Sequence, residues 1–220
     1  MTIHIHKEID RLKKMILEMG TKVEHNLHEA VKTIVKFDLA IAERLMGEEE
    51  DIINQMEIDI EEECLKTLAL HQPVAVDLRV LVVILKINNE LERINDFSVN
   101  LAERAIDLNR LGAIQFPFDF LGMAELSQAM LAKCLDSLIH MNPELAREVI
   151  ASDDEVDSRH AAVYQVVKEE ILSKPEKIDI TIQYPSISRY LERVADLACN
   201  IAEDVIYLVE GDIVRHQEES

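Results

Sequence analysis

Two stretches of the sequence place carboxylates at the spacing of successive helical turns. Each has a Glu, an Asp four residues later, an Asn eight residues later and a second Glu eleven residues later. At about 100° per residue, these positions fall within an arc of roughly 80° on a helix. Because apolar residues occupy nearly the opposite side, we expect each set to point away from the core of its bundle. We call these sets the acidic stripes: Glu92, Asp96, Asn100 and Glu103, and Glu192, Asp196, Asn200 and Glu203.

Carboxylates one helical turn apart are suited to binding a metal ion through oxygen. Like charges four residues apart destabilise a helix by roughly 0.2–0.5 kcal/mol per pair, and a bound cation reverses that effect. Oxygen ligands without thiolates favour iron or manganese, with zinc as a further candidate. We therefore predict a divalent or trivalent metal at Glu92 with Asp96, and at Glu192 with Asp196. The alternative is an ordinary solvated acidic face.

More acids lie where a second helix is expected to begin in each half of the chain. Acids in the first turn commonly stabilise the helix dipole, so one interpretation is structural. The other is that they complete the metal sites, since their helices directly precede the acidic stripes. They are Glu49, Glu50 and Asp51 in the first half, and Asp153, Asp154 and Asp157 in the second. On the second interpretation, Glu50, Asp153 and Asp157 are the completing ligands.

Apolar residues recur at steps of three and four, which predicts that helices position these groups. In the first half the pattern predicts helices over 5–46, 49–70 and 73–109, with Asp38 as a candidate cap. The stretch 111–120 has no helical period and is interpreted as a linker. The second half is expected to hold helices over 121–141 (restarting at Asn142–Pro143), from Ser152 or Asp153 to Ser173, and, after a break at Lys174–Pro175, up to Glu210 and Gly211.

The second half repeats the first. The segment LERINDFSVNLAE at 91–103 matches LERVADLACNIAE at 191–203, with seven of thirteen positions identical. The stretch 38–46 likewise resembles 142–150. The predicted fold is therefore all-α, with two tandem three-helix bundles from an internal duplication, at 1–110 and 121–220.

The composition excludes several classes of function. A formal net charge of −20 disfavours binding to nucleic acid and to anionic membranes. Apolar stretches are too short to span a membrane, and the N-terminal residues do not resemble a signal peptide, so we expect a soluble cytoplasmic protein. Three widely spaced cysteines, Cys64, Cys134 and Cys199, are expected to be buried free thiols.

Catalytic and phosphate-binding motifs are absent from the sequence. There is no G-x-x-x-x-G-K-[ST] loop and no basic cluster suited to free phosphate. Di-metal enzymes with a ferritin-like fold need paired E-x-x-H motifs, whereas Asp157 and His160 form a single D-x-x-H. With no Ser-His-Asp or Cys-His arrangement, we expect a protein that is not an enzyme.

The segments LERINDFSVNLAE and YLERVADLACNIAEDVIYLVEG, in tandem at this spacing, resemble the signature of the PhoU family over nearly the whole chain. The E/D-x-x-x-D motifs of the family map onto Glu92 with Asp96 and Glu192 with Asp196. Asn95 and Ala195 stand where a small residue, often Gly, is usual, and Phe97 stands where many members carry His. Neither departure removes a carboxylate.

This resemblance implies two three-helix bundles, often dimeric, with iron, manganese or zinc on the acidic stripes. It also implies negative regulation of the phosphate response, through the phosphate ABC transporter and a sensor histidine kinase. A homodimer that acts as an adaptor between these partners is therefore our first hypothesis. The alternatives are a carboxylate-bridged metalloenzyme and a metal-free structural helical protein.

Overall fold

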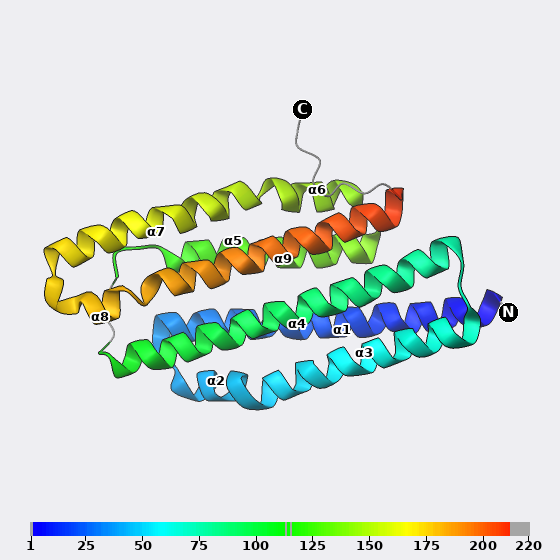
Figure 1. The fold of residues 1–220 in the computed structure, drawn as a ribbon, viewed down its shortest axis with the longest axis horizontal. Helices are drawn as coiled ribbons and strands as arrows, with labels where there is room; N and C mark the ends of the chain where they lie inside the picture. Colours follow the sequence, from blue (N-terminus) through cyan, green and yellow to red (C-terminus); the bar gives the residue numbers. More distant parts are fainter. Residues whose placement is uncertain (1, 113, 115, 212–220) are drawn as a thin grey trace.

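The two halves of the chain form two layers of helices (Figure 1). The computed structural model describes residues 2–112, 114 and 116–211, and no strand occurs within them. One layer holds α1 (Thr2–Lys36), α2 (Leu39–Arg44), α3 (Glu50–His71) and α4 (Ala75–Arg110). The other holds α5 (Phe120–His140), α6 (Pro143–Ala151), α7 (Asp153–Ser173), α8 (Ile178–Thr181) and α9 (Tyr184–Glu210).

The predicted all-α class with two similar bundles is confirmed. The boundaries predicted at 110 and 121 stay predictions, and residues 113 and 115 of the predicted linker lie outside the described residues.

The first long helix ends earlier than the sequence pattern predicts. We expected one helix over 5–46, but α1 ends at Lys36 and Phe37 adopts a left-handed backbone with φ of 53°. Asp38 then caps α2, because its side chain accepts a hydrogen bond from the Ile41 backbone N–H. The predicted cap at Asp38 is therefore confirmed, while the predicted end of the first helix is wrong.

A π-helical turn, η1 (Leu45–Glu49), joins α2 to α3 without a break. A π-turn holds one more residue than an α-turn, and such turns are frequent at functional sites. The second half has no counterpart: Glu50 lies 12 positions after the cap Asp38, whereas Asp153 lies 11 positions after the cap Asn142. The extra residue of η1 thus sets which acid of the first half corresponds to Asp153.

The second layer follows the prediction more closely. Asn142 caps α6 through Leu145, with Pro143 in the first turn. The predicted break at Lys174–Pro175 is present as the 3₁₀ turn η2 (Pro175–Lys177), which leads through α8 to α9. Gly211 ends α9 in the left-handed conformation, with φ of 82°, which is favourable for glycine.

The two layers share one hydrophobic core, and α4 runs antiparallel to α9 across their junction (Figure 1). Polar and aromatic pairs join these two helices. The Lys86 Nζ lies 2.5 Å from Asp204 Oδ1, the rings of Phe97 and Tyr190 stack with centroids 5.9 Å apart, and Arg104 donates to Gln183 at 2.8 Å. The halves therefore form one packed unit.

The three cysteines are free thiols. Cys64 and Cys134 are buried as predicted, whereas Cys199 is partly exposed. Burial raises the pKa of Cys64 to about 12 and raises the pKa of the other two thiols further. Among the helices of the described segments, none is both long and apolar enough to cross a membrane.

Candidate metal-binding clusters

The first acidic stripe lies on α4 beside the beginning of α3. Burial raises the pKa of Glu50, and the nearby charges of Asp96, Asp51 and Glu103 raise it further. The start of α3 therefore brings Glu50 close to the stripe, and its role as a metal ligand stays a prediction. The pKa of Asp96 is also raised by burial, although the guanidinium of Arg93 opposes this shift.

Glu92 has an acidic neighbour on α3 that the prediction did not include. Burial raises the pKa of Glu92 first, and the charges of Asp96 and Glu57 add to the shift. Glu57 lies two turns after Glu50 on α3, so the two helices face each other along this region. We define the first acidic cluster as Glu50, Glu57, Glu92 and Asp96.

The second acidic stripe lies on α9 beside the beginning of α7. Burial raises the pKa of Asp153 to about 6, and the charges of Asp157, Asp196 and Glu192 contribute next. The pKa of Glu192 is raised by burial and by Asp196, while His160 lowers it. The structure thus brings together the four acids that the sequence assigned to this half.

His160 lies beside the second cluster, and its Nδ1 contacts the hydroxyl of Ser188. The Ser188 hydroxyl donates to the Pro185 carbonyl at 3.0 Å, and His160 Nδ1 lies 2.9 Å from the same hydroxyl oxygen. When the hydroxyl donates to the Pro185 carbonyl, its oxygen accepts from Nδ1–H, and this tautomer has its lone pair on Nε2. Metal-binding histidines are commonly oriented in this way. We define the second acidic cluster as Asp153, Asp157, His160, Glu192 and Asp196.

Glu57 and His160 occupy equivalent positions in the two halves. Burial repeats at a separation of 103 residues along α3 and α7, with Ile53 matching Val156 and Ile60 matching Val163. At the same separation Glu57 matches His160. Glu57 raises the pKa of Glu92, and His160 lowers the pKa of Glu192. The sequence shows one D-x-x-H motif, Asp157 with His160, and no second copy of it in the first half. When the halves are aligned after η1, the residue equivalent to His160 is Glu57, which has a carboxylate in place of the imidazole.

The donor atoms of the clusters suit a cation. Asp153 Oδ1 is buried and has no hydrogen-bond partner among the described residues, which leaves an anionic oxygen without compensation. The first cluster offers only carboxylates, and the second adds an imidazole. Within residues 5–112, 114 and 116–211, however, no three such side chains converge as a preformed metal site. The side chains therefore have to move together to ligate one ion.

The expected solvent-facing orientation of the stripes holds only in part. Glu92, Glu192 and Asp196 are partly buried, because α3 and α7 pack beside them. The second stripe also meets the other half of the molecule, since Asn200 donates to Glu90 on α4 at 3.3 Å. The stripes thus lie beside α3 and α7, while Asp96 and Glu103 of the first stripe remain exposed.

Two similar helical bundles, each with an acidic stripe on its last long helix, define a duplicated-domain helical protein. A family model described as "PhoU domain" matches residues 16–105 and again 120–205. The chain belongs to the PhoU family.

Named relatives match over almost the whole length. The phosphate-specific transport system accessory protein PhoU homolog of Aquifex aeolicus is 34% identical over 213 residues, which are 97% of this chain and 96% of that protein. The homolog from Pseudomonas aeruginosa is 35% identical, covering 95% of this chain and 86% of that protein. The crystal structure of PhoU from P. aeruginosa superposes with a TM-score of 0.88 at 34% identity, over 94% of this chain and 99% of that one.

Proposed function

We propose that this protein is a negative regulator of the phosphate-starvation response that carries metal on its two acidic clusters. Family membership supports a regulatory role in phosphate signalling, since the relatives are named accessory proteins of phosphate-specific transport. We infer an adaptor, in the cytoplasm and as a homodimer, between the phosphate ABC transporter and a sensor histidine kinase. It favours the signalling-off state of both when phosphate is plentiful.

The observation that carries the metal proposal is the electrostatics of the second cluster. A buried oxygen of Asp153 lacks a partner, and the pKa of this carboxyl reaches about 6 beside three further acids. A bound divalent or trivalent cation neutralises this like charge. Asp153, Asp157, Glu192 and Asp196 would hold it, with His160 Nε2 as a nitrogen donor.

The first cluster would hold its cation through oxygen alone, from Glu50, Glu57, Glu92 and Asp96. Iron and manganese suit such donors best, and zinc becomes a stronger candidate where an imidazole is present. The two clusters are therefore expected to differ in metal preference. A carboxylate-bridged metalloenzyme is the second candidate, favoured only by the imidazole of His160 beside the second cluster.

Elemental analysis and partner binding test the proposal together. The transporter ATPase subunit and the cytoplasmic part of the kinase from the same genome are mixed with metal-loaded protein or with chelator-treated protein. We expect the metal-loaded protein to bind both partners, and the amount of each bound partner to fall after chelation. In the variant Asp153→Asn/Asp196→Asn, bound metal should fall and partner retention should fall with it.

The control is Glu61→Gln/Glu62→Gln, which removes two exposed acids of α3 outside the clusters. It changes the net charge equally and should leave metal and partner retention unchanged. Normal partner binding by a protein that never holds metal would reject the metal proposal and keep the adaptor. Failure of both partners to bind would reject the adaptor itself. Light scattering and cell fractionation test the homodimer and the location.

A further inference from the structure

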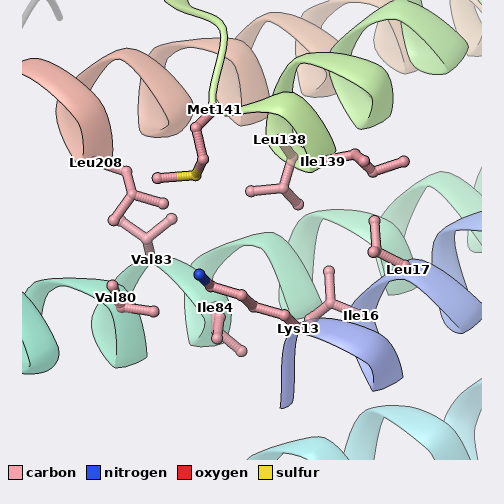
Figure 2. Close-up of a pocket in the computed structure, with 10 residues that line it drawn as sticks. All are labelled: Lys13, Ile16, Leu17, Val80, Val83, Ile84, Leu138, Ile139, Met141 and Leu208. Atoms are coloured by element: carbon pink, nitrogen blue, oxygen red, sulfur yellow. The ribbon is translucent and has the colours of Figure 1, made fainter. Parts of the chain in front are cut away.

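An apolar cavity of about 70 Å³ lies where the two halves meet (Figure 2). Its wall is built from both halves. Val83 and Ile84 come from α4, Leu138 and Ile139 from α5, and Leu208 from α9. None of the residues that line the cavity belongs to either acidic cluster. The proposed metal sites therefore do not account for it.

One charged side chain lines this apolar cavity. Lys13 of α1 is partly buried, and Figure 2 shows its side chain extending toward the α4 side of the cavity. Among the described residues, Lys13 donates no hydrogen bond and forms no ion pair. The same holds for other lysines of the chain, such as Lys14, so what sets Lys13 apart is its position in the apolar lining. The cavity thus combines apolar walls with one ammonium group that forms no ion pair among the described residues.

Such a lining selects for a particular ligand. An apolar wall favours an aliphatic group, and an ammonium without a partner favours a carboxylate through a charge-assisted hydrogen bond. A doubly charged anion such as phosphate would have to lose its hydration against apolar walls, with only one cation to compensate. The charge and the wall together therefore favour a monovalent amphipathic acid over an inorganic anion.

The volume limits the size of the aliphatic part. An engineered cavity of about 150 Å³ binds benzene, so about 70 Å³ has room for roughly three or four carbon atoms. We propose that this cavity binds a short-chain aliphatic carboxylate, with its tail between α4, α5 and α9 and its carboxylate on Lys13 Nζ. This proposal is independent of the proposed regulatory function and of the metal.

Occupancy of the cavity has a structural consequence. Its walls belong to α1 and α4 on one side and to α5 and α9 on the other, so a bound ligand contacts both halves. A ligand that binds only the packed arrangement stabilises that arrangement by mass action. Binding should therefore raise the melting temperature of the whole chain and not that of one half alone.

The test uses the full chain and a series of sodium carboxylates at constant ionic strength. Methyl NMR monitors Val83, Ile84 and Leu208, and thermal melts report on stability. We expect saturable shifts of these methyls with butyrate and pentanoate, weaker shifts with acetate, and weak binding of octanoate, which exceeds the cavity. Inorganic phosphate should shift none of them.

Lys13→Met tests the charge, because Met keeps an apolar stem of similar length while losing the ammonium. We expect its affinity for pentanoate to fall about tenfold. Lys14→Met is the matched control, since Lys14 is the exposed neighbour on α1 and lies outside the cavity. Equal pentanoate affinity in Lys13→Met and the parent would overturn the proposal. So would a parent chain whose cavity methyls show no saturable shift, a result that needs no variant to fold.

Discussion

Replacing Asp153 by Asn should stabilise the metal-free protein, and the gain should depend on pH. The pKa of Asp153 in the folded state is about 6, against an ordinary value of 3.8. That difference corresponds to about 3 kcal/mol of free energy that disfavours the ionised form on folding. Because Asp153 is only partly buried, solvent screening reduces the effect, and we expect a gain of about 1–2 kcal/mol for Asp153→Asn.

The sign follows from proton binding. Between about pH 4 and pH 6, the folded state holds a proton on Asp153 that the unfolded state has released. Stability of the parent therefore falls as the pH rises through this window, and it stays lower above it. Asp153→Asn should match the parent near pH 4 and exceed it at pH 8. For a chain of this length the gain amounts to roughly 2–8 °C in melting temperature.

A matched control removes a competing effect. Asp153 is in the first turn of α7, where its charge favours the helix dipole by about 0.3–1 kcal/mol. Asp154 shares that turn and is exposed, so Asp154→Asn loses the dipole contribution without relieving the buried charge. Melts in chelator at pH 4 and pH 8 give the comparison. A gain for Asp153→Asn that is absent at pH 8, or equal to that of Asp154→Asn, would refute the reasoning.

The other predictions concern metal, catalysis and folding. Asp96→Asn/Asp196→Asn should lower bound metal, measured by elemental analysis, with little loss of thermal stability; unchanged metal content would mean that these acids form only a solvated face. His160→Gln should reduce zinc relative to manganese in competition at the second cluster, whereas Glu57→Gln should not favour manganese at the first. Phosphate esters and nucleotides should not be turned over, and metal-dependent hydrolysis that is lost in Glu192→Gln would establish an enzyme instead. Far-UV circular dichroism should remain helical in chelator, because the apolar core does not depend on the clusters; a collapse to coil would contradict this.

Sequence patterns predicted the helices and the stripes because both depend on local periodicity. Glu92 with Asp96 and Glu192 with Asp196 are visible because a period of 3.6 places them on one helical face. The caps Asp38 and Asn142 were found for the same reason, since capping depends on neighbouring residues in the chain.

Features that depend on distant contacts or on one inserted residue were not predicted. The π-turn η1 has no sequence signal of its own, and without it the register between α3 and α7 cannot be assigned. Glu57 was therefore missed, and His160 was left without a role. The partial burial of Glu92 and Glu192 was also missed, because it depends on how α3 and α7 pack against α4 and α9.

The contacts between α4 and α9 show a symmetry that the sequence repeat alone does not require. Lys86 meets Asp204 while Arg104 meets Gln183, and Glu90 meets Asn200 while Phe97 meets Tyr190. Adding 100 to the α4 residue of one contact and subtracting 100 from its α9 residue gives nearly the positions of a second contact. The contact of Lys86 with Asp204 thus corresponds to that of Gln183 with Arg104. The halves are thus related by an internal pseudo-twofold axis that passes near the middle of both helices.

An interface of this kind is isologous, the kind that two identical subunits form when they close as a dimer. The chain is in effect a dimer of one unit with its two subunits joined covalently. Two identical subunits carry the same residue at both equivalent sites. The two joined copies are encoded separately, so their residues can differ. The carboxylate of Glu57 and the imidazole of His160 are a difference that only the joined form can have.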